Sequence, residues 1–386
     1  MTFRNGEGQV LWRSPSREPV LARIAIAGDF LPAGKLTVPE GCTWRDMASS
    51  VSGYFHDVAT SFVNLECCLD AGALRPRPPS GLGDIVSAPV DSLDYLEAMR
   101  CIAPGIANNH IYDFGDSGVT RTRAAISSRS MIPLGAGRSL TESPEVFVWT
   151  GPGDIRIGFW AAAAATRDPS TLRKAGVEPA TLVRASVAHD KLRKLGGGMC
   201  IALLHAGAMR TNRPDSEQVK LMDSLANSGF DIVAASHSHR ISGHRRIDTN
   251  NASPSFCFYG LGTLVSGFTS GPLEREGLIV IAGINCGGKI SSVEVRPIAL
   301  ASNGFAAIPV PPEGREILNR FAALSDEIAD GSHEQMFYRD ISLGLLRLYG
   351  RDVKAAFHAG GFRGLARKAS RVRARHMRRL VHKVIG

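Results

Sequence analysis

Residues able to hold a divalent metal ion stand directly after short apolar stretches of this 386-residue sequence. They are Asp29 after residues 22–27, Glu66 after 61–65, His205 after 200–204, and His237 with His239 after 231–235. Carboxylate oxygens and imidazole nitrogens together suit manganese, iron or zinc. A carboxylate can also bridge two ions about 3.5–4 Å apart, the spacing at which two-metal sites activate water for attack at phosphorus. These residue types therefore predict a site for one or two divalent ions.

Each of these residues also has a purely structural interpretation. Asp29 follows a glycine and could belong to a turn or a helix cap, and His205 could be a hydrogen-bonded core histidine. The run from Asn108 to His110 could reflect turn chemistry, since asparagine tolerates left-handed backbone. Packing does not explain two histidines separated by one residue, at positions 237 and 239. The combination is more specific than its parts, because several separate segments carry the right residue types.

The elements that position these residues are predicted strands alternating with helices. The apolar stretches read as nearly continuous buried strands, with a further one at residues 255–259, which indicates a sheet covered on both faces. Helical spacing begins at Pro214, and a second helix is expected over 116–130 with Asp116 or Ser117 as its N-cap. This alternation predicts an α/β fold, in which ligands bind at the carboxyl ends of the strands.

Later segments complete the predicted organisation. Residues 277–284 and 290–297 are expected to form a hairpin around Cys-Gly-Gly. The proline-rich segment 309–314 is typical of a linker, and a helix is expected over 315–329.

Composition excludes several classes of protein. The seven cysteines form no Cys-x-x-Cys pair, so a disulfide scaffold or a cysteine zinc site is not expected, and the thiols should be reduced. The first 21 residues have no apolar core, which argues against a secretory signal. Since no stretch of about 18 apolar residues exists, no membrane span is expected. These features favour a cytoplasmic location.

The positive charge is concentrated at the C-terminal end. The formal net charge is +9, and residues 351–386 contain 11 lysines and arginines against one aspartate. Apolar residues recur among the arginines of 363–383, as in a basic amphipathic helix. Such a tail could bind anionic lipid at the inner membrane face, at roughly 1 kcal/mol per basic residue. A solvated helix is an equal alternative, and nucleic acid is a weaker one.

The order of the motifs resembles the CapA family, which is named for capsule and poly-γ-glutamate synthesis and is itself similar to the calcineurin-like metallophosphoesterases. The motifs are Ile-Ala-Gly-Asp (26–29), Asn-Leu-Glu (64–66), Ala-Asn-Asn-His-x-x-Asp-Phe-Gly (107–115), Leu-Gly-Ala-Gly-Arg (134–138), His-Ala-Gly (205–207), His-Ser-His (237–239) and Phe-Tyr-Gly-Leu-Gly (258–262). The resemblance covers about residues 22–300. It implies an αββα four-layer sandwich of the metallophosphatase type, whereas periodicity alone gives only α/β.

The resemblance also implies a role for each site residue. Glu66 would bridge two ions, Asp29 and His239 would complete one metal site, and the second site would be completed by Asn109, His205 and His237. His110 would not bind metal. As an imidazolium it would stabilise charge on a phosphoryl oxygen or protonate a leaving group.

Substrate binding is the role expected of three further residues. Asn108 lies beside the metal-site asparagine, and Arg210 and Arg213 follow His205 closely enough to clamp an anionic substrate. The alternative for the two arginines is a solvated loop.

Four positions depart from the family pattern. Leu31 stands where the phosphoesterases carry a metal-binding histidine, which the CapA relatives also lack. Met209, Ser236 and Thr263 stand where relatives commonly have glutamate, histidine and Gly-Asn. The first metal site therefore has only three visible protein donors. Occupancy by one ion, or binding without turnover, remains an alternative.

The sequence thus predicts an N-terminal extension (1–21), a CapA-like domain (22–308) and a C-terminal helical extension with a basic tail (309–386). The favoured function is a metal-dependent hydrolase of phosphoesterase type that acts in capsule or exopolymer biosynthesis on an anionic small-molecule or polymer substrate. The alternative is a non-catalytic metal-binding component of such machinery.

Overall fold

Two β-sheets form the centre of the computed structural model, which describes residues 8–15, 18–77, 85–142, 144–164, 168–249, 253–269 and 271–341. The chain divides into two compact units, Met1–Gly331 and Ser332–Gly386, and the elements below belong to the first. The predicted basic tail, 351–386, lies outside the described residues, so its binding to lipid stays a prediction.

The first sheet is mixed and has seven strands. Its order is β1 (Gln9–Arg13), β16 (Ile290–Leu300), β15 (Glu276–Asn285), β2 (Val20–Gly34) and β14 (Thr263–Gly267), with β3 (Thr60–Leu65) on β2 and β17 (Ala306–Ala307) on β16. β15 and β16 pair antiparallel, which confirms the predicted hairpin.

The second sheet has six strands and carries the histidines. Its order is β12 (His244–Ile247), β13 (Ser255–Phe258), β11 (Ile232–Ser236), β10 (Met199–His205), β8 (Arg156–Ala163) and β7 (Phe147–Thr150). The four central strands are parallel. His205 pairs with Ala163 on one side and Ser236 on the other, so β8, β10 and β11 end level with one another.

The two sheets pack face to face around a shared apolar core. Alternate residues of β10 point to opposite faces, so Ile201 and Leu203 join the core between the sheets while Leu204 joins the core under the helices. The ring of Phe62 on β3 meets that of Phe159 on β8 edge-on at 4.9 Å. Each such fully buried side chain stabilises the fold by about 1.5–3 kcal/mol.

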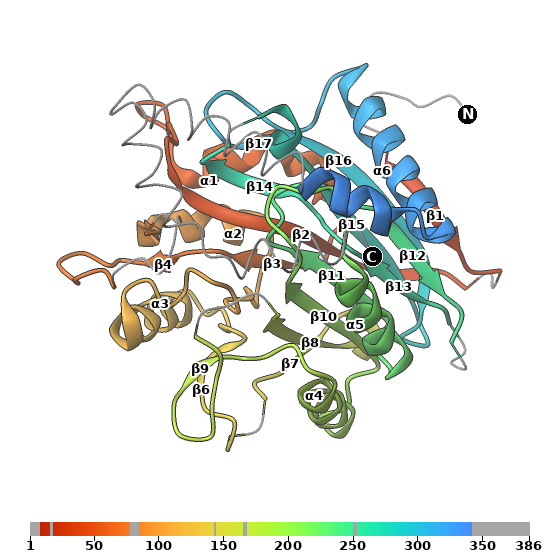
Figure 1. Ribbon diagram of the computed structural model, residues 1–386, viewed down its shortest axis with the longest axis horizontal. Coiled ribbons are helices and arrows are strands. Elements are labelled where there is room, and N and C mark those ends of the chain that lie inside the picture. Colours follow the sequence, from red (N-terminus) through yellow and green to blue (C-terminus); the bar gives the residue numbers. More distant parts are fainter. Residues whose placement is uncertain are drawn as a thin grey trace, which may run out of the picture. The chain divides into compact units, whose positions relative to one another are not determined.

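Helices cover the outer face of each sheet. α4 (Leu182–Lys194) and α5 (Ser216–Asn227) lie along the second sheet, with Leu192 and Met222 in its outer core (Figure 1). α2 (Leu93–Ala98) covers the first sheet, where Tyr95 stacks on Phe30 at 5.3 Å, and α1 (Trp44–Ala48) packs beside α2. The layers are therefore helix, sheet, sheet and helix, which confirms the predicted αββα sandwich.

Smaller elements complete the first unit. They are α3 (Gly115–Ser128), α6 (Glu313–Asp330), the paired strands β4 (Cys68–Leu69) and β5 (Ser87–Ala88), the paired strands β6 (Ala136–Arg138) and β9 (Gly176–Val177), and the short 3-10 helices η1 (Ser49–Tyr54), η2 (Val90–Ser92), η3 (Pro152–Asp154) and η4 (Pro272–Arg275).

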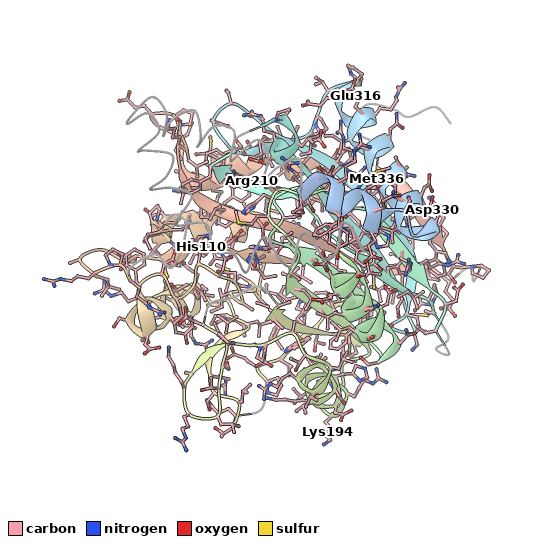
Figure 2. The ribbon with its side chains drawn as sticks, in the orientation of Figure 1. His110, Lys194, Arg210, Glu316, Asp330 and Met336 are labelled. Carbon is pink, nitrogen blue, oxygen red and sulfur yellow. The ribbon has the colours of Figure 1, made fainter. Side chains whose placement is uncertain are left out.

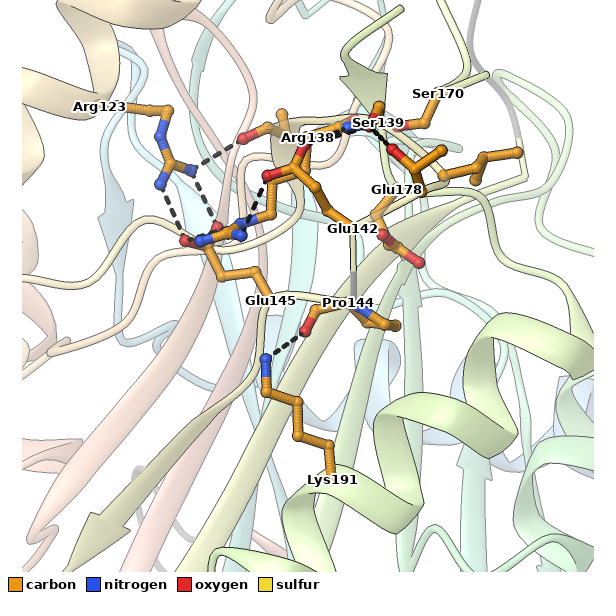
Figure 3. A network of polar contacts seen from close by, with 12 residues as sticks. Arg123, Arg138, Ser139, Glu142, Pro144, Glu145, Ser170, Glu178 and Lys191 are labelled. Carbon is orange, nitrogen blue, oxygen red and sulfur yellow. Dashed lines mark hydrogen bonds and ion pairs between the residues drawn. The ribbon is translucent and has the colours of Figure 1, made fainter. Parts of the chain in front are cut away.

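A polar network fixes the segment between β6 and β7. Arg123 of α3 donates to both carboxylate oxygens of Glu145, at 2.9 and 2.8 Å (Figure 3). Lys191 of α4 donates to the carbonyl of Pro144 at 3.0 Å. The segment is thus held by α3 and α4 through separate side chains.

Several sequence expectations are corrected by the structure. Asp29 lies inside β2 rather than after the strand, because β2 continues to Gly34 past an irregularity in its pairing with β3. α3 begins at Gly115, with Phe114 at the N-cap position and no side-chain cap, so the predicted caps at Asp116 and Ser117 are wrong. β1 lies within the predicted N-terminal extension and α6 lies in the first compact unit, while the predicted domain boundaries themselves stay a prediction.

Two observations concern the cysteines and the lengths of the helices. All seven cysteines are free thiols. Among the helices that the structure describes, none has the length and apolar character needed to cross a bilayer.

Candidate functional site

A bulge in β2 places Asp29 beside the end of β3. The pairing of the two strands shifts register between Ala27 and Asp29, and such a bulge re-aims the side chain that follows it. Gly28 is required there, because a Cβ at this position would lie 2.1 Å from the carbonyl oxygen of Gly262. Glu66 directly follows β3, and its backbone N–H donates to the carbonyl of Phe30 at 3.0 Å. Both carboxylates are fully buried.

The second sheet supplies the three histidines from two neighbouring strands. His205 is the last residue of β10, and His237 and His239 lie just beyond β11. Both of the latter have left-handed backbone, with φ values of 104° and 56°. Such a conformation is costly for a residue with a side chain, and it persists where surrounding structure enforces it. The backbone N–H of His237 donates to Oδ2 of Asp29 at 2.9 Å, which ties the two sheets together at this point.

Two groups of potential metal ligands meet at Glu66. One contains Asp29, Glu66 and His239, and the other contains Glu66, His205 and His237; within each group the ligand atoms lie within 4.8 Å of one another. Nε2 of His205 lies 3.5 Å from Oε1 of Glu66, while Nδ1 of His239 lies 3.7 Å from Oε2. The two oxygens of Glu66 therefore face different groups, as a bridging carboxylate would.

The unmet hydrogen-bonding capacity of these atoms fits a cation. Both oxygens of Glu66 and the Nδ1 atoms of His237 and His239 are buried and make no hydrogen bond. Nδ1 of His239 lies 3.1 Å from Oδ2 of Asp29, but without hydrogen-bond geometry. Buried polar groups are rarely left without partners. Lone pairs that converge in this way are the arrangement expected around a divalent ion.

Asn109 adds an oxygen to the second group. Its Oδ1 lies 2.5 Å from Nε2 of His205, the nitrogen that also faces Glu66. Asn64 orients the first group from behind: its amide nitrogen donates to Oδ1 of Asp29 at 2.7 Å, which leaves Oδ2 directed toward His239.

Burial and nearby charges shift the protonation equilibria of the site, and the shifts of His205, His237 and Asp29 favour metal binding whereas that of Glu66 opposes it. Burial, helped by the nearby Asp29 carboxylate, raises the pKa of Glu66 well above its ordinary value. Burial and the neighbouring His237 ring lower the pKa of His205 well below its ordinary value, and burial lowers the pKa of His237 to about 4. Burial alone would raise the pKa of Asp29, but the adjacent rings of His239 and His205 hold it below its ordinary value. Neutral imidazoles at pH 7 are the form that binds metal.

His110 belongs to neither metal-ligand group, but it lies near enough to help lower the pKa of His205 and that of His237. Its Nδ1 lies 2.8 Å from Oδ2 of Asp113, an oxygen that also accepts the backbone N–H of Val86 at 2.9 Å (His110 is labelled in Figure 2). With the proton on Nδ1 directed at a carboxylate, Nε2 is the nitrogen left for another partner. Asp113 and Asn64 had no predicted role, although both belong to motifs found in the sequence.

The three predicted substrate-binding residues have different surroundings. Asn108 is fully buried and uses its side chain locally, donating to the carbonyl of Leu65 and accepting from two backbone N–H groups. Arg213 forms a two-point ion pair with Glu327 of α6, at 2.6 and 2.7 Å. Arg210 is exposed, and its backbone N–H donates to the carbonyl of Ser238, between the two histidines that follow β11. The structure therefore brings only Arg210 to the rim of the site with an exposed charge.

The departures from the family pattern add no donor to the first group. Leu31 is buried and apolar, and Met209 is 48% exposed. Thr263 uses its hydroxyl to donate to the backbone carbonyl of His239 at 3.3 Å. The first group consequently keeps three protein donors among the described residues.

The chain is similar to several known proteins. The family model described as bacterial capsule synthesis protein PGA_cap matches residues 23–267. The capsule biosynthesis protein CapA of Bacillus anthracis is 24% identical over 168 residues, which are 42% of this chain and 39% of that protein. A probable polyglutamine synthesis accessory protein of Mycobacterium tuberculosis is 26% identical over 253 residues, 60% of this chain and 62% of that protein. The match thus spans less than two thirds of either relative.

A solved structure also resembles the chain. The calcineurin-like phosphoesterase YfkN from Bacillus subtilis superposes with a TM-score of 0.43 at 11% identity, covering 80% of this chain and 97% of that one.

Proposed function

Because this chain belongs to the bacterial capsule synthesis protein PGA_cap family, we propose that it is a metal-dependent hydrolase of phosphoesterase type, acting in the biosynthesis of a capsule or related exopolymer. One observation carries the catalytic part of the proposal. Glu66 is buried between two groups of ligand atoms, and both of its oxygens lack hydrogen bonds. An uncompensated buried carboxylate is costly, and a shared pair of cations would compensate it.

The chain offers ligands for two ions, with Glu66 shared between them. Asp29, Glu66 and His239 would hold one, and Glu66, Asn109, His205 and His237 would hold the other. Oxygen with imidazole donors suits manganese, iron or zinc. Bound there, the ions would polarise a phosphoryl oxygen and lower the pKa of water. Asn64 would keep the Asp29 carboxylate aligned, because its amide already holds Oδ1 at 2.7 Å.

His110 would assist the reaction as a proton or hydrogen-bond donor. Asp113 accepts from its Nδ1 and stabilises positive charge on the ring, so Nε2 can donate to a phosphoryl oxygen or to the leaving oxygen. Both side chains are almost buried, which strengthens their interaction relative to water. Arg210, exposed at the rim, would pair with an anionic part of the substrate.

Metal analysis and hydrolysis of an aryl phosphate, each with manganese, iron and zinc, test the proposal. We expect wild-type protein to bind metal and turn over substrate. His110→Ala should keep its metal and lose about 10²- to 10⁴-fold in rate. His56→Ala is the matched control, since His56 is an exposed histidine outside both ligand groups. Metal binding without turnover on any phosphoester would instead indicate a non-catalytic component of capsule assembly.

A further inference from the structure

A pocket of about 670 Å³ lies on the outer face of the first sheet. Its floor is formed by the paired strands β1 and β16, and its walls by the end of η1 and by residues 308–311. Trp12 of β1 contacts Phe256 of the second sheet and pairs with Val293. Because side chains alternate along β16, Glu294 points away from the second sheet. None of the residues in the two metal-ligand groups lines this pocket.

Two charged side chains of β16 stand together on the floor of the pocket. Nε of Arg296 donates to Oε1 of Glu294 at 2.7 Å, and Nη1 donates to the carbonyl of Tyr54 at 2.8 Å. The guanidinium also lies over the ring of Tyr54, 5.5 Å from its centre. The side chains of Arg296 and Glu294 are only 12% and 20% exposed. These contacts fix the positions of one cationic and one anionic group.

Each member of this pair keeps one unused atom. Among the residues that the structure describes, no hydrogen bond uses Nη2 of Arg296 or Oε2 of Glu294. Nη2 can donate and Oε2 can accept, and the bond from Nε to Oε1 holds the two groups side by side. A ligand with an anionic and a cationic group close together would match both. An α-amino acid has this arrangement, because one carbon joins its carboxylate and its ammonium group.

The charges around the pair are balanced. Nε of Arg23 lies 3.1 Å from Oδ2 of Asp57, whose Oδ1 lies 3.8 Å from Nη1 of Arg296. Together with Glu294, these residues contribute two positive and two negative charges. A ligand with a net charge would disturb this balance, whereas a zwitterion preserves it. The charge pattern therefore favours a zwitterion over a phosphate or a simple carboxylate.

The walls of the pocket are apolar. Val10 and Val310 are 43% and 72% exposed, and Ile308 is half-buried between two prolines and η1. Exposed aliphatic side chains beside a polar pair leave apolar surface that a ligand can cover. The volume of the pocket lies within the range of about 300–1,000 Å³ that is common for small-molecule sites.

We propose that this pocket binds a free α-amino acid with a large apolar side chain. Its carboxylate would accept from Nη2 of Arg296, its ammonium group would donate to Oε2 of Glu294, and its side chain would pack on Val10, Ile308 and Val310. A peptide has only one of the two charged groups at each end, so the pair selects the free amino acid. The site is separate from the candidate metal centre and does not depend on the proposed hydrolase activity.

Isothermal titration calorimetry on the full-length protein tests this inference, with and without manganese. The probes are L-phenylalanine and L-leucine. N-acetyl-L-phenylalanine lacks the ammonium group, L-phenylalanine amide lacks the carboxylate, and L-glutamate carries a charged side chain. The variants are Glu294→Gln, which keeps the size of the side chain, and Val310→Asp, which changes a wall residue that is exposed and therefore tolerant of substitution.

Each variant has a matched control on the helices that cover the second sheet. Glu217 of α5 is an exposed glutamate, and Val183 of α4 is 74% exposed, close to the value for Val310. Neither residue lines the pocket. Glu217→Gln and Val183→Asp should therefore bind both amino acids like the wild type.

We expect saturable binding of L-phenylalanine or L-leucine with a Kd on the order of 0.1–1 mM, unchanged by manganese. Each blocked analogue, and L-glutamate, should bind about 10-fold more weakly than the better of the two. Glu294→Gln should weaken binding about 3- to 10-fold and reduce the penalty of N-acetylation, because the two changes remove the same contact. Val310→Asp should weaken binding about 2- to 5-fold.

Any of three results would overturn the inference. They are the absence of saturable binding for both amino acids, blocked analogues that bind as tightly as free L-phenylalanine, and an equal loss of binding in the matched control variants.

Discussion

Replacing Asp113 with asparagine removes one negative charge from beside His110. The amide oxygen can take the place of Oδ2 and keep both bonds, those from His110 Nδ1 at 2.8 Å and from the Val86 N–H at 2.9 Å. A hydrogen bond to a charged group contributes about 1.5–3 kcal/mol and a neutral one about 0.5–1.5 kcal/mol. The difference, about 1–1.5 kcal/mol, predicts a loss of roughly 5- to 13-fold in kcat/KM.

The assay is hydrolysis of an aryl phosphate by metal-loaded protein, with bound metal measured on the same samples. Asp113→Asn should lose rate while its metal content stays at the wild-type level, because Asp113 belongs to neither ligand group. In a His110→Ala background the same substitution should cause no further loss, since its effect passes through the imidazole. Two results would refute this reasoning. One is an Asp113→Asn variant with the wild-type rate, and the other is a further loss of rate when Asp113→Asn is added to His110→Ala.

Three other substitutions test the site and the fold. Glu66→Gln should weaken metal binding at both positions, as measured by metal titration. Losing a residue that only hydrogen-bonds to a metal ligand lowers metal affinity roughly 10- to 100-fold, so losing the shared ligand itself should lower it by more. His244→Gln should flatten the pH dependence of stability, because burial lowers the pKa of His244 to about 4 from an ordinary 6.5. The wild type should therefore lose on the order of 2–3 kcal/mol more than the variant as pH falls from 6.5 to 4, measured by urea unfolding. Gly28→Ala should lower the thermal midpoint by several degrees, because its Cβ would lie 2.1 Å from the Gly262 oxygen.

Residues at the ends of buried strands could be predicted from the sequence alone. Glu66 and His205 stand at the ends of nearly continuous apolar runs, and these runs form β3 and β10. Parallel strands in one sheet bring their carboxyl ends to one edge, so the proximity of His205 to the histidines after β11 follows from the pattern. That the second sheet would meet Asp29 and Glu66 came from the family resemblance, since periodicity does not specify how two sheets pack.

The remaining parts of the site depend on contacts that no local pattern encodes. Asp29 was expected after its strand, but a bulge lets β2 continue through it, and bulges depend on the pairing partner. In the sequence, Asn64 has the features of an ordinary strand residue. Its contact with Asp29 depends on the pairing of β3 with β2. Asp113 contacts Nδ1 of His110 because of the turns that precede α3. The capping rules predicted the start of α3 at the wrong residue.

Anomalous X-ray diffraction from crystals of the protein soaked in manganese tests the central claim most directly. We predict two peaks on either side of the Glu66 carboxylate, one within ligand distance of Asp29 and His239 and the other near His205 and His237. Crystals that diffract well but show no peak among these side chains, with manganese bound elsewhere or not at all, would contradict the proposed metal centre and the chemistry built on it.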